Sequence, residues 1–237
     1  MKIDRLALVA LTLLAGFTGS RAWLRDHPQH DPWAPLDLND PPGWATSRKI
    51  AALRDDPLEC RATLNRSEID FAVRPPVGER ECRREDRTIL APGALPNLSF
   101  RPATPDATCA VDVALVLWLS KGVQPAATAI LGSRVRAVEH YGTHSCRRIY
   151  GRAEGSWSEH STGNAIDIAG FTLADGRRVN IRRDWASGEP AGRFLRAVHE
   201  AACGTFGTVL SPDYNAAHAD HFHLDQAAGR FGEGICR

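Results

Sequence analysis

Residues Ser158 to Gly170, SEHSTGNAIDIAG, place charged and polar side chains at the start and in the middle of an apolar segment. Residues 164–171 have the composition of a buried strand, yet His160 lies just before this strand and Asp167 in its middle. A polar turn feeding a strand, with the aspartate capping a local group, would account for both residues. Two ligands of one metal ion would also account for them, and Gly163 permits the tight turn that brings His160 back over the strand.

A second group of histidines lies at residues 218–225, HADHFHLD. His221 and His223 are two residues apart, so in a strand both project from the same face. Two histidines and one carboxylate, with a position left for water, are typical of catalytic zinc sites. The sequence therefore predicts one zinc ion held by His160, Asp167 and His223. Zinc lowers the pKa of its bound water to about 7, and Asp220 or His221 is placed to take the proton or stabilise an oxyanion.

The surrounding pattern predicts an α+β domain, with a mostly antiparallel sheet and helices packed on one face. The apolar run 107–123 predicts a central helix capped by Asp106, and a further helix begins at 124–132. An amphipathic helix is expected at 191–203, and strands are expected at 133–142, 164–171, 205–210 and 221–225.

The N-terminal residues indicate export. Lys2 and Arg5 precede the apolar run Leu6–Phe17, a pattern typical of a signal peptide, although Arg21 makes a poor cleavage context. Residues 1–22 are thus predicted to be a signal peptide or an N-terminal anchor, with residues 6–20 in the inner membrane in the second case. We expect a periplasmic or otherwise exported protein, and the near balance of 29 basic and 28 acidic residues argues against nucleic-acid binding.

The predicted organisation after this segment has three parts. They are a proline-rich linker at 23–45, a small irregular annex at 46–100 that starts with a short helix after Thr46 or Ser47, and a catalytic domain at 101–237. In an oxidising compartment the even set of six cysteines predicts disulfides. Pairing of neighbours in sequence would give Cys60–Cys82, Cys109–Cys146 and Cys203–Cys236.

Several ordered motifs carry a resemblance to known proteins. SEHSTGNAIDI resembles the metal-binding stretch of zinc carboxypeptidases that remove terminal D-alanine, and HADHFH is similar to the H-x-x-H-x-H of penicillin-insensitive murein endopeptidases. These belong to the group that joins lysostaphin-type enzymes, D-Ala-D-Ala carboxypeptidases and the Hedgehog domain. The last ~180 residues resemble the bacterial extensin-like C-terminal family more closely. The landmarks are TCAVDVALVLWL, HSCRRIYG, SEHSTGNAIDIAGF, FLRAVHEAAC and SPDYNAAHADHFHLD.

The resemblance implies a Hedgehog/D-Ala-D-Ala-peptidase-like core and roles for particular residues. It implies His160, Asp167 and His223 as zinc ligands. The carboxypeptidases have a glutamate at the position of Asp220, and the endopeptidases a histidine at that of His221; we favour His221 because the shorter Asp220 would have to reach further.

The resemblance implies that Arg147, with Arg148 as a substitute, binds the substrate carboxylate; surface arginines are the alternative. We also expect His218 and Ser158 to bind substrate, although Ser158 could instead simply begin the strand. We expect Glu159 to be exposed, and His140, His144 and His199 to lie outside the site.

The function implied is hydrolysis of peptide bonds in peptidoglycan stem peptides or cross-links, by a carboxypeptidase or an endopeptidase. Two alternatives stay open at this point. One is a non-catalytic zinc-containing domain of the same fold that binds cell wall or a protein partner. The other is a disulfide-stapled structural domain whose histidines bind adventitious metal. A complete set of three ligands with a neighbouring acid or base favours the enzyme.

Overall fold

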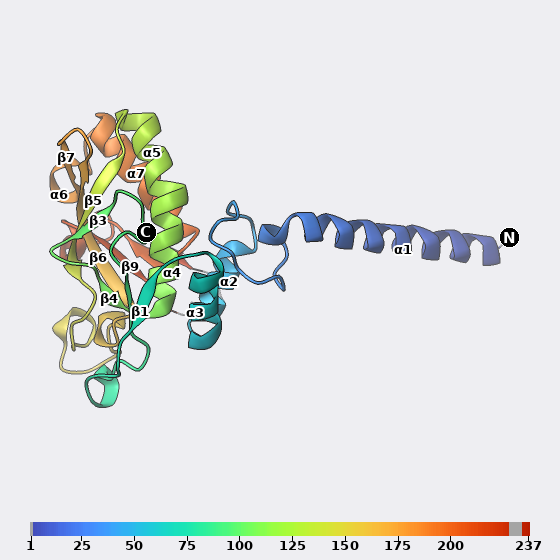
Figure 1. The fold of residues 1–237 in the computed structure, drawn as a ribbon, viewed down its shortest axis with the longest axis horizontal. Coiled ribbons are helices and arrows are strands. Elements are labelled where there is room, and N and C mark those ends of the chain that lie inside the picture. The colour runs from blue at the N-terminus through green and yellow to red at the C-terminus, as the bar shows by residue number, and fades with distance from the viewer. Residues whose placement is uncertain (1, 228–233) are drawn as a thin grey trace.

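The structure is a computed structural model that describes residues 2–227 and 234–237 (Figure 1). Its main sheet has seven strands over these residues, in the order β10-β8-β9-β6-β5-β3, with β7 paired to β6. The pairs β3–β5 and β10–β8 are parallel and all others antiparallel. The strands are β3 (Ser99–Arg101), β5 (Val135–Gly142), β6 (Ala165–Leu173), β7 (Arg178–Asn180), β8 (Thr208–Leu210), β9 (Phe222–Asp225) and β10 (Ile235–Cys236).

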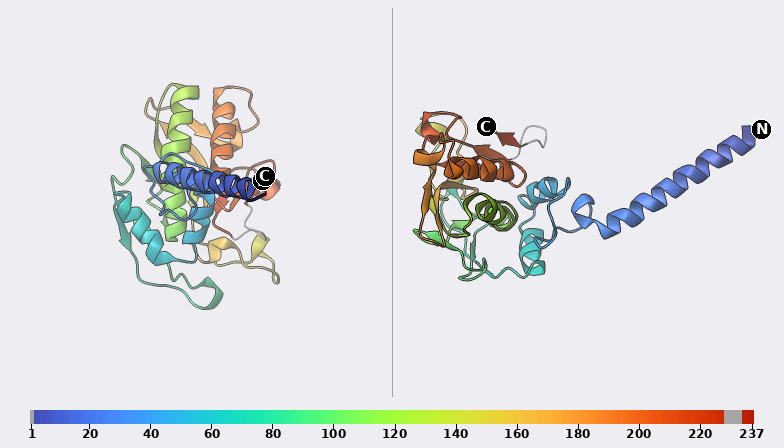
Figure 2. Two further views of the ribbon diagram at one scale, coloured as in Figure 1. Left: turned by 90° about the vertical axis from the view of Figure 1, so that its right-hand side faces the viewer. Right: turned by 90° about the horizontal axis from the view of Figure 1, so that it is seen from above.

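One face of this sheet is covered by helices, which confirms the predicted α+β class (Figures 1 and 2). Helix α7 (Pro190–Cys203) buries Phe194, Leu195 and Val198. Helix α4 (Cys109–Leu117) is buried along its whole length. Burial of such apolar side chains stabilises the fold by about 1.5–3 kcal/mol each, so these two helices supply much of the core.

The central helix differs from the prediction at both ends. It begins at Cys109 after Thr108, whereas Asp106 lies in β4 (Asp106–Ala107) and pairs with arginines instead of capping the helix. Two separate helices were expected, but α4 continues through a π-helical segment (Trp118–Val123), α5 (Gln124–Ala126) and a second π-helical segment (Ala127–Leu131). The run is unbroken because its buried side chains belong to one hydrophobic core, in which α2 and α3 pack on α4 and α7 packs on the later segments. This tertiary packing outweighs the local cost of a proline.

The residues before β3 form a second layer on the outer side of α4. They supply α2 (Thr46–Leu53), α3 (Pro57–Arg66) and, with β4, a three-stranded sheet that includes β1 (Phe71–Val73) and β2 (Thr88–Leu90). Their buried side chains share one hydrophobic core with the main sheet. The short remaining helices are Pro28–His30, Arg80–Cys82, Ile149–Gly151, Glu159–Ser161, α6 (Ile181–Asp184) and Ala216–His218.

All six cysteines form disulfides, but two of the predicted pairs were wrong. The bridges are Cys60–Cys109, Cys82–Cys146 and Cys203–Cys236. Packing of α3 against α4 brings Cys60 to the first turn of the central helix. Cys82 therefore pairs with Cys146, in the loop after β5. These cysteines pair because they are close in space, although they are not neighbours in sequence. Only the bridge that ties the C-terminus to α7 follows the predicted order.

The chain begins with a 25-residue helix, α1 (Lys2–Asp26), that projects from the domain (Figures 1 and 2). Within it, residues 5–26 are long and apolar enough to cross a membrane, as a signal sequence would also be. The run Cys109–Leu131 passes the same test, but it is the buried core helix described above. The expected linker that follows α1 contacts the domain at several points, with Leu36 and Leu38 buried in the core.

Candidate metal centre

Strand parity places two of the predicted ligands on the sheet face that the helices leave open. On β6, Ile166 and Ile168 belong to the core, so Asp167 between them points away from the helices. On the neighbouring β9, Phe222 and Leu224 belong to the core in the same way. Asp167 and His223 are paired directly across the two strands. The alternation of apolar and polar residues thus brings these two side chains together.

The third predicted ligand comes from a tight turn before β6. The Ser158 hydroxyl accepts a hydrogen bond from the His160 amide at 3.3 Å and begins this turn. Gly163 closes the turn with φ +77°, a left-handed conformation that glycine adopts without steric cost. The turn is fixed further by the Asn164 side chain, which donates to the Glu159 carboxylate at 2.6 Å. His160 is consequently buried and points back over β6.

Three ligand atoms converge at this point. His160 Nε2 lies 3.1 Å from Asp167 Oδ1 and 3.1 Å from His223 Nδ1, and the last two atoms are 3.0 Å apart. Ligands of a tetrahedral zinc with bonds of about 2.0–2.1 Å stand about 3.3 Å from each other. The spacing of the three atoms fits a small divalent cation with this preference.

The outer nitrogen of each ring already has an acceptor. His160 Nδ1 lies 3.1 Å from the Thr143 carbonyl oxygen, and His223 Nε2 lies 2.8 Å from Asp225 Oδ2. Because these oxygens can only accept, we assign the ring protons to the outer nitrogens. With the outer nitrogens protonated, the inner nitrogens and Asp167 face one another, and either a shared proton or a bound cation satisfies this arrangement. Such outer partners of metal-binding histidines are a regular feature of metal sites.

The pKa values of the cluster agree with an electron-rich centre. Burial alone would lower the pKa of His223, but its bonds to Asp167 and Asp225 outweigh burial and raise it to about 9. Burial would raise the pKa of Asp167, but the two histidines hold it well below its usual range. Metal binding to such a site displaces the proton that an imidazole otherwise retains.

His221 and Asp220 form a pair beside the cluster. His221 Nε2 lies 3.5 Å from Asp167 Oδ1, and its Nδ1 lies 2.9 Å from Asp220 Oδ1. The strand begins at Phe222, after both residues, so Asp220 is not forced to the opposite face by strand parity. Its carboxylate instead contacts the far side of the His221 ring and orients it. Both predicted residues are therefore at the centre, with His221 nearer to the ligand atoms.

The cluster opens into a cavity of about 380 Å³. Arg147 lines this cavity, and its side chain has no hydrogen-bond partner within the described residues. The Arg148 guanidinium lies 4.5 Å over the Trp157 ring and bonds the Gly155 carbonyl, so it is already engaged elsewhere. Apolar and aromatic side chains complete the wall, namely Ile149, Tyr150, Trp157, Tyr214 and Ile235.

Other predicted residues have these places in the structure. His218 and Ser158 line the cavity, and His218 Nδ1 lies 2.8 Å from Asn215 Oδ1. Burial and the nearby His221 and His223 lower the pKa of His218 to about 4, which favours a neutral ring. His140, His144 and His199 lie outside the cavity lining.

The prediction for Glu159 was wrong. Glu159 is only partly exposed because it accepts the Asn164 bond that holds the turn of His160.

Sequence reasoning missed two partners of the ligands. Asp225 could have been found, since it stands two residues after His223 and so shares its strand face. The Thr143 carbonyl could not, because every residue has such a group and only the loop path brings this one to His160.

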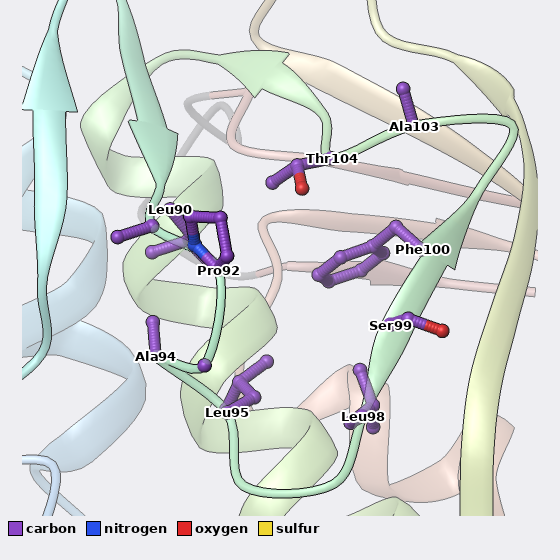
Figure 3. Close-up of a pocket in the computed structure, with 11 residues that line it drawn as sticks. Leu90, Pro92, Ala94, Leu95, Leu98, Ser99, Phe100, Ala103 and Thr104 are labelled. Atoms are coloured by element: carbon purple, nitrogen blue, oxygen red, sulfur yellow. The ribbon is translucent and has the colours of Figure 1, made fainter.

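Two other features do not compete with this centre. His199, Cys203 and Cys236 lie close together, but both cysteines are in a disulfide and cannot bind metal as thiolates. A cavity of about 320 Å³ lies between β2 and β3, lined by residues such as Leu90, Leu95 and Phe100 (Figure 3). Its lining contains no titratable side chain, so it lacks groups for acid–base or metal chemistry.

Comparison with known proteins identifies the family. No curated protein and no solved structure matches the chain. A family model described as the extensin-like protein C-terminus matches residues 58–237, which include all the cavity-lining residues named above. Since the match covers well over half of the sequence, the chain belongs to the extensin-like protein C-terminus family.

Proposed function

We propose that this protein is an exported, zinc-dependent peptidase that hydrolyses peptide bonds in peptidoglycan stem peptides or cross-links. The observation that carries the proposal is the convergence of three ligand atoms within 3.1 Å of one another at a cavity that also contains a third imidazole, that of His221, oriented by Asp220. The resemblance of SEHSTGNAIDI and HADHFH to zinc carboxypeptidases and murein endopeptidases supports the choice of substrate.

His160, Asp167 and His223 would hold the metal. Zinc bound there would supply a Lewis acid and a water of lowered pKa. The protein groups around it have separate tasks. Thr143 and Asp225 hold the two rings in the tautomers that bind a cation. His221, whose Nε2 faces the cluster while Asp220 holds its Nδ1, would accept or donate the proton in peptide hydrolysis.

Arg147 is suited to a carboxylate of the substrate. Its guanidinium is always charged and can form two parallel hydrogen bonds to a carboxylate. Stem peptides of the cell wall carry such groups, and the apolar wall near Arg147 suits their alanine methyl groups. The cavity thus combines a charged anchor with an apolar surface beside the metal ligands.

The test is hydrolysis of defined muropeptides by the metal-stripped protein before and after addition of zinc, followed by mass spectrometry. We expect no product without metal, restored activity with zinc, and no restoration in Asp167→Asn. His144→Ala, which removes an exposed histidine outside the cavity, is the matched control and should retain activity. A protein that binds zinc but cleaves none of the substrates would instead be the non-catalytic binding domain.

A further inference from the structure

The first helix presents apolar side chains to its surroundings on all sides. Seven of them are more than half exposed, from Val9 at 55% to Leu6 at 71%; the others are Leu8, Leu11, Leu13, Leu14 and Phe17. None of the apolar window of α1 is buried within the protein. Its 25 residues extend about 37 Å, whereas the hydrocarbon layer of a bilayer is about 30 Å thick. A water-exposed helix of this composition needs a covering, and a bilayer fits its length.

Exposed tryptophans lie near the end of this helix and in the segment that follows it. Trp23, Trp33 and Trp44 are 48%, 82% and 63% exposed, and we call these three residues the aromatic collar. The Trp23 ring stacks on His27 with centroids 4.4 Å apart, and the Trp44 ring stacks on His30 with centroids 6.5 Å apart. Tryptophan is enriched at the boundary between lipid and water, where its apolar ring and polar N–H are both accommodated. The collar therefore has the composition of a membrane-interface belt.

The segment that carries the collar is joined firmly to the folded domain. Lys49 Nζ donates to the Pro28 carbonyl at 2.6 Å, and Arg66 Nη1 donates to the Leu36 carbonyl at 2.7 Å. The Leu38 amide donates to the Ser67 hydroxyl at 2.8 Å. These contacts leave little freely moving chain between α1 and the domain. A surface that binds the collar would therefore also lie next to the domain.

The layer order fixes which face points away from that surface. In both Figure 1 and the right view of Figure 2, the helical layer lies between α1 and the main sheet. Asp167 and His223 are on the sheet face opposite the helices, because their strand neighbours Ile166 and Phe222 point into the core. The metal centre thus opens on the side of the domain remote from α1.

We propose that α1 is retained and embedded in a phospholipid bilayer, that the aromatic collar lies at the bilayer surface, and that this attachment directs the metal centre away from the membrane. The proposal rests on the apolar side chains of α1 and on the aromatic collar, so it is independent of the peptidase activity.

Quenching of tryptophan fluorescence by brominated lipid tests both parts of this proposal. The full chain is reconstituted in phosphatidylcholine vesicles with or without bromine on the acyl carbons nearest the headgroup. Three tryptophans lie in the collar, whereas Trp118 and Trp185 are buried in the core and Trp157 lines the cavity. The triple variant Trp23→Phe/Trp33→Phe/Trp44→Phe removes the collar, and Trp157→Phe is the matched control.

We expect brominated lipid to quench the wild type and Trp157→Phe equally, and the triple variant at least threefold less. The single variant Trp33→Phe, at the most exposed position, should show an intermediate loss if the triple variant does not fold. Equal quenching of the triple variant would place Trp157 near the lipid and overturn the orientation. Absence of quenching in the wild type, or a mature chain that starts after residue 22 by N-terminal sequencing, would overturn the attachment.

Discussion

At the scale of single residues, the geometry of the metal centre depends on the groups that hydrogen-bond to the ligands as much as on the ligands themselves. The Thr143 carbonyl and the Asp225 carboxylate each occupy the outer nitrogen of a histidine and leave the inner nitrogen free to bind. Ligand residue types were predictable from the spacing of His160, Asp167 and His223. Their orientation depends on the path of a loop and on a backbone oxygen, which no residue pattern encodes.

Asp225→Asn should weaken zinc binding without removing a ligand. The amide cannot hold the proton of His223 Nε2 as strongly as the carboxylate, and loss of such outer partners usually costs about 10–100-fold in metal affinity. Competition with a chelating dye measures the affinity. Asp213→Asn, which changes an exposed aspartate in the segment between β8 and β9, is the control and should bind zinc as the wild type does. Equal affinity in both variants would show that Asp225 does not orient His223.

The variants His221→Ala and Asp220→Asn test which of the two residues beside the cluster transfers the proton. His221→Ala should keep zinc and fold but lose about 10²–10⁴-fold in turnover, the usual contribution of a proton-transfer group. Asp220→Asn should lose much less, because Asp220 contacts the outer nitrogen of His221 rather than the reacting atoms. Rates on one muropeptide, with zinc content checked, decide between them. An inactive Asp220→Asn together with an active His221→Ala would reverse the assignment.

At the scale of elements, the turn between residues 158 and 164 positions His160 and depends on the conformation of Gly163. An added Cβ at Gly163 would lie 2.7 Å from Arg84 Nε, in a left-handed conformation at φ +77°. The Arg84 side chain is buried and donates to Asp106, so it has little freedom to move. The sequence indicated the need for glycine at this turn, but Arg84 comes from the layer before β3, far from Gly163 in sequence. Its contact was therefore not predictable from local spacing.

Gly163→Ala should destabilise the protein more than Gly176→Ala. Gly176 has a similar left-handed φ of +89°, but an added Cβ there meets nothing within 4 Å. The backbone strain shared by both variants costs about 1–2 kcal/mol, and the clash with Arg84 adds to it only at Gly163. Urea unfolding of the metal-free proteins measures the difference, and zinc titration of Gly163→Ala should show weaker binding by the displaced His160. Identical unfolding free energies would mean that Arg84 moves aside without cost.

The central helix contains a fully buried acid that should make stability depend on pH. Asp112 in α4 accepts a hydrogen bond from Thr88 at 2.7 Å, and its other oxygen has no partner. Burial, followed by the charges of Asp86 and Asp106, raises its pKa well above the usual value despite the Thr88 bond. The folded protein thus holds a proton that the unfolded chain releases near pH 4. This contribution to stability is complete below that pH and declines, by about 1.4 kcal/mol per pH unit at most, as the pH rises towards the folded pKa.

Asp112→Asn removes this titration. The free energy of unfolding of the variant, relative to the wild type, should therefore be higher at pH 8 than at pH 4. Urea unfolding at both values measures it. Parallel changes of the two proteins with pH would contradict a protonated Asp112 in the folded state.

At the scale of the whole molecule, the layer order was predictable, whereas two of the three disulfides were not. The periodicity of residues 133–142, 164–171 and 191–203 gave strands and a helix that the structure confirms as β5, β6 and α7. Disulfide connectivity depends on which segments meet in space. The docking of α3 on α4 decided the partner of Cys60, and the sequence around Cys60 contains no sign of it. Long-range packing likewise joined the two expected helices of residues 107–132 into one run.

The layered arrangement also explains how one chain combines its parts. Helices on one sheet face leave the other face free for Asp167 and His223, and the N-terminal helix leaves the domain on the helical side. The disulfide Cys82–Cys146 ties the loop that carries Arg147 to the layer before β3. The candidate centre is thus built on strands and a fixed turn, which suits a preorganised metal site.

The metal centre can be tested by the zinc content of the protein purified without chelator. We expect one zinc per chain by elemental analysis, because three ligand atoms converge within 3.1 Å of one another with their outer partners in place. We expect zinc to be lost in the double variant His160→Ala/His223→Ala and kept in His144→Ala. Absence of zinc from the wild type, or full occupancy in the double variant, would contradict the assignment of His160, Asp167 and His223.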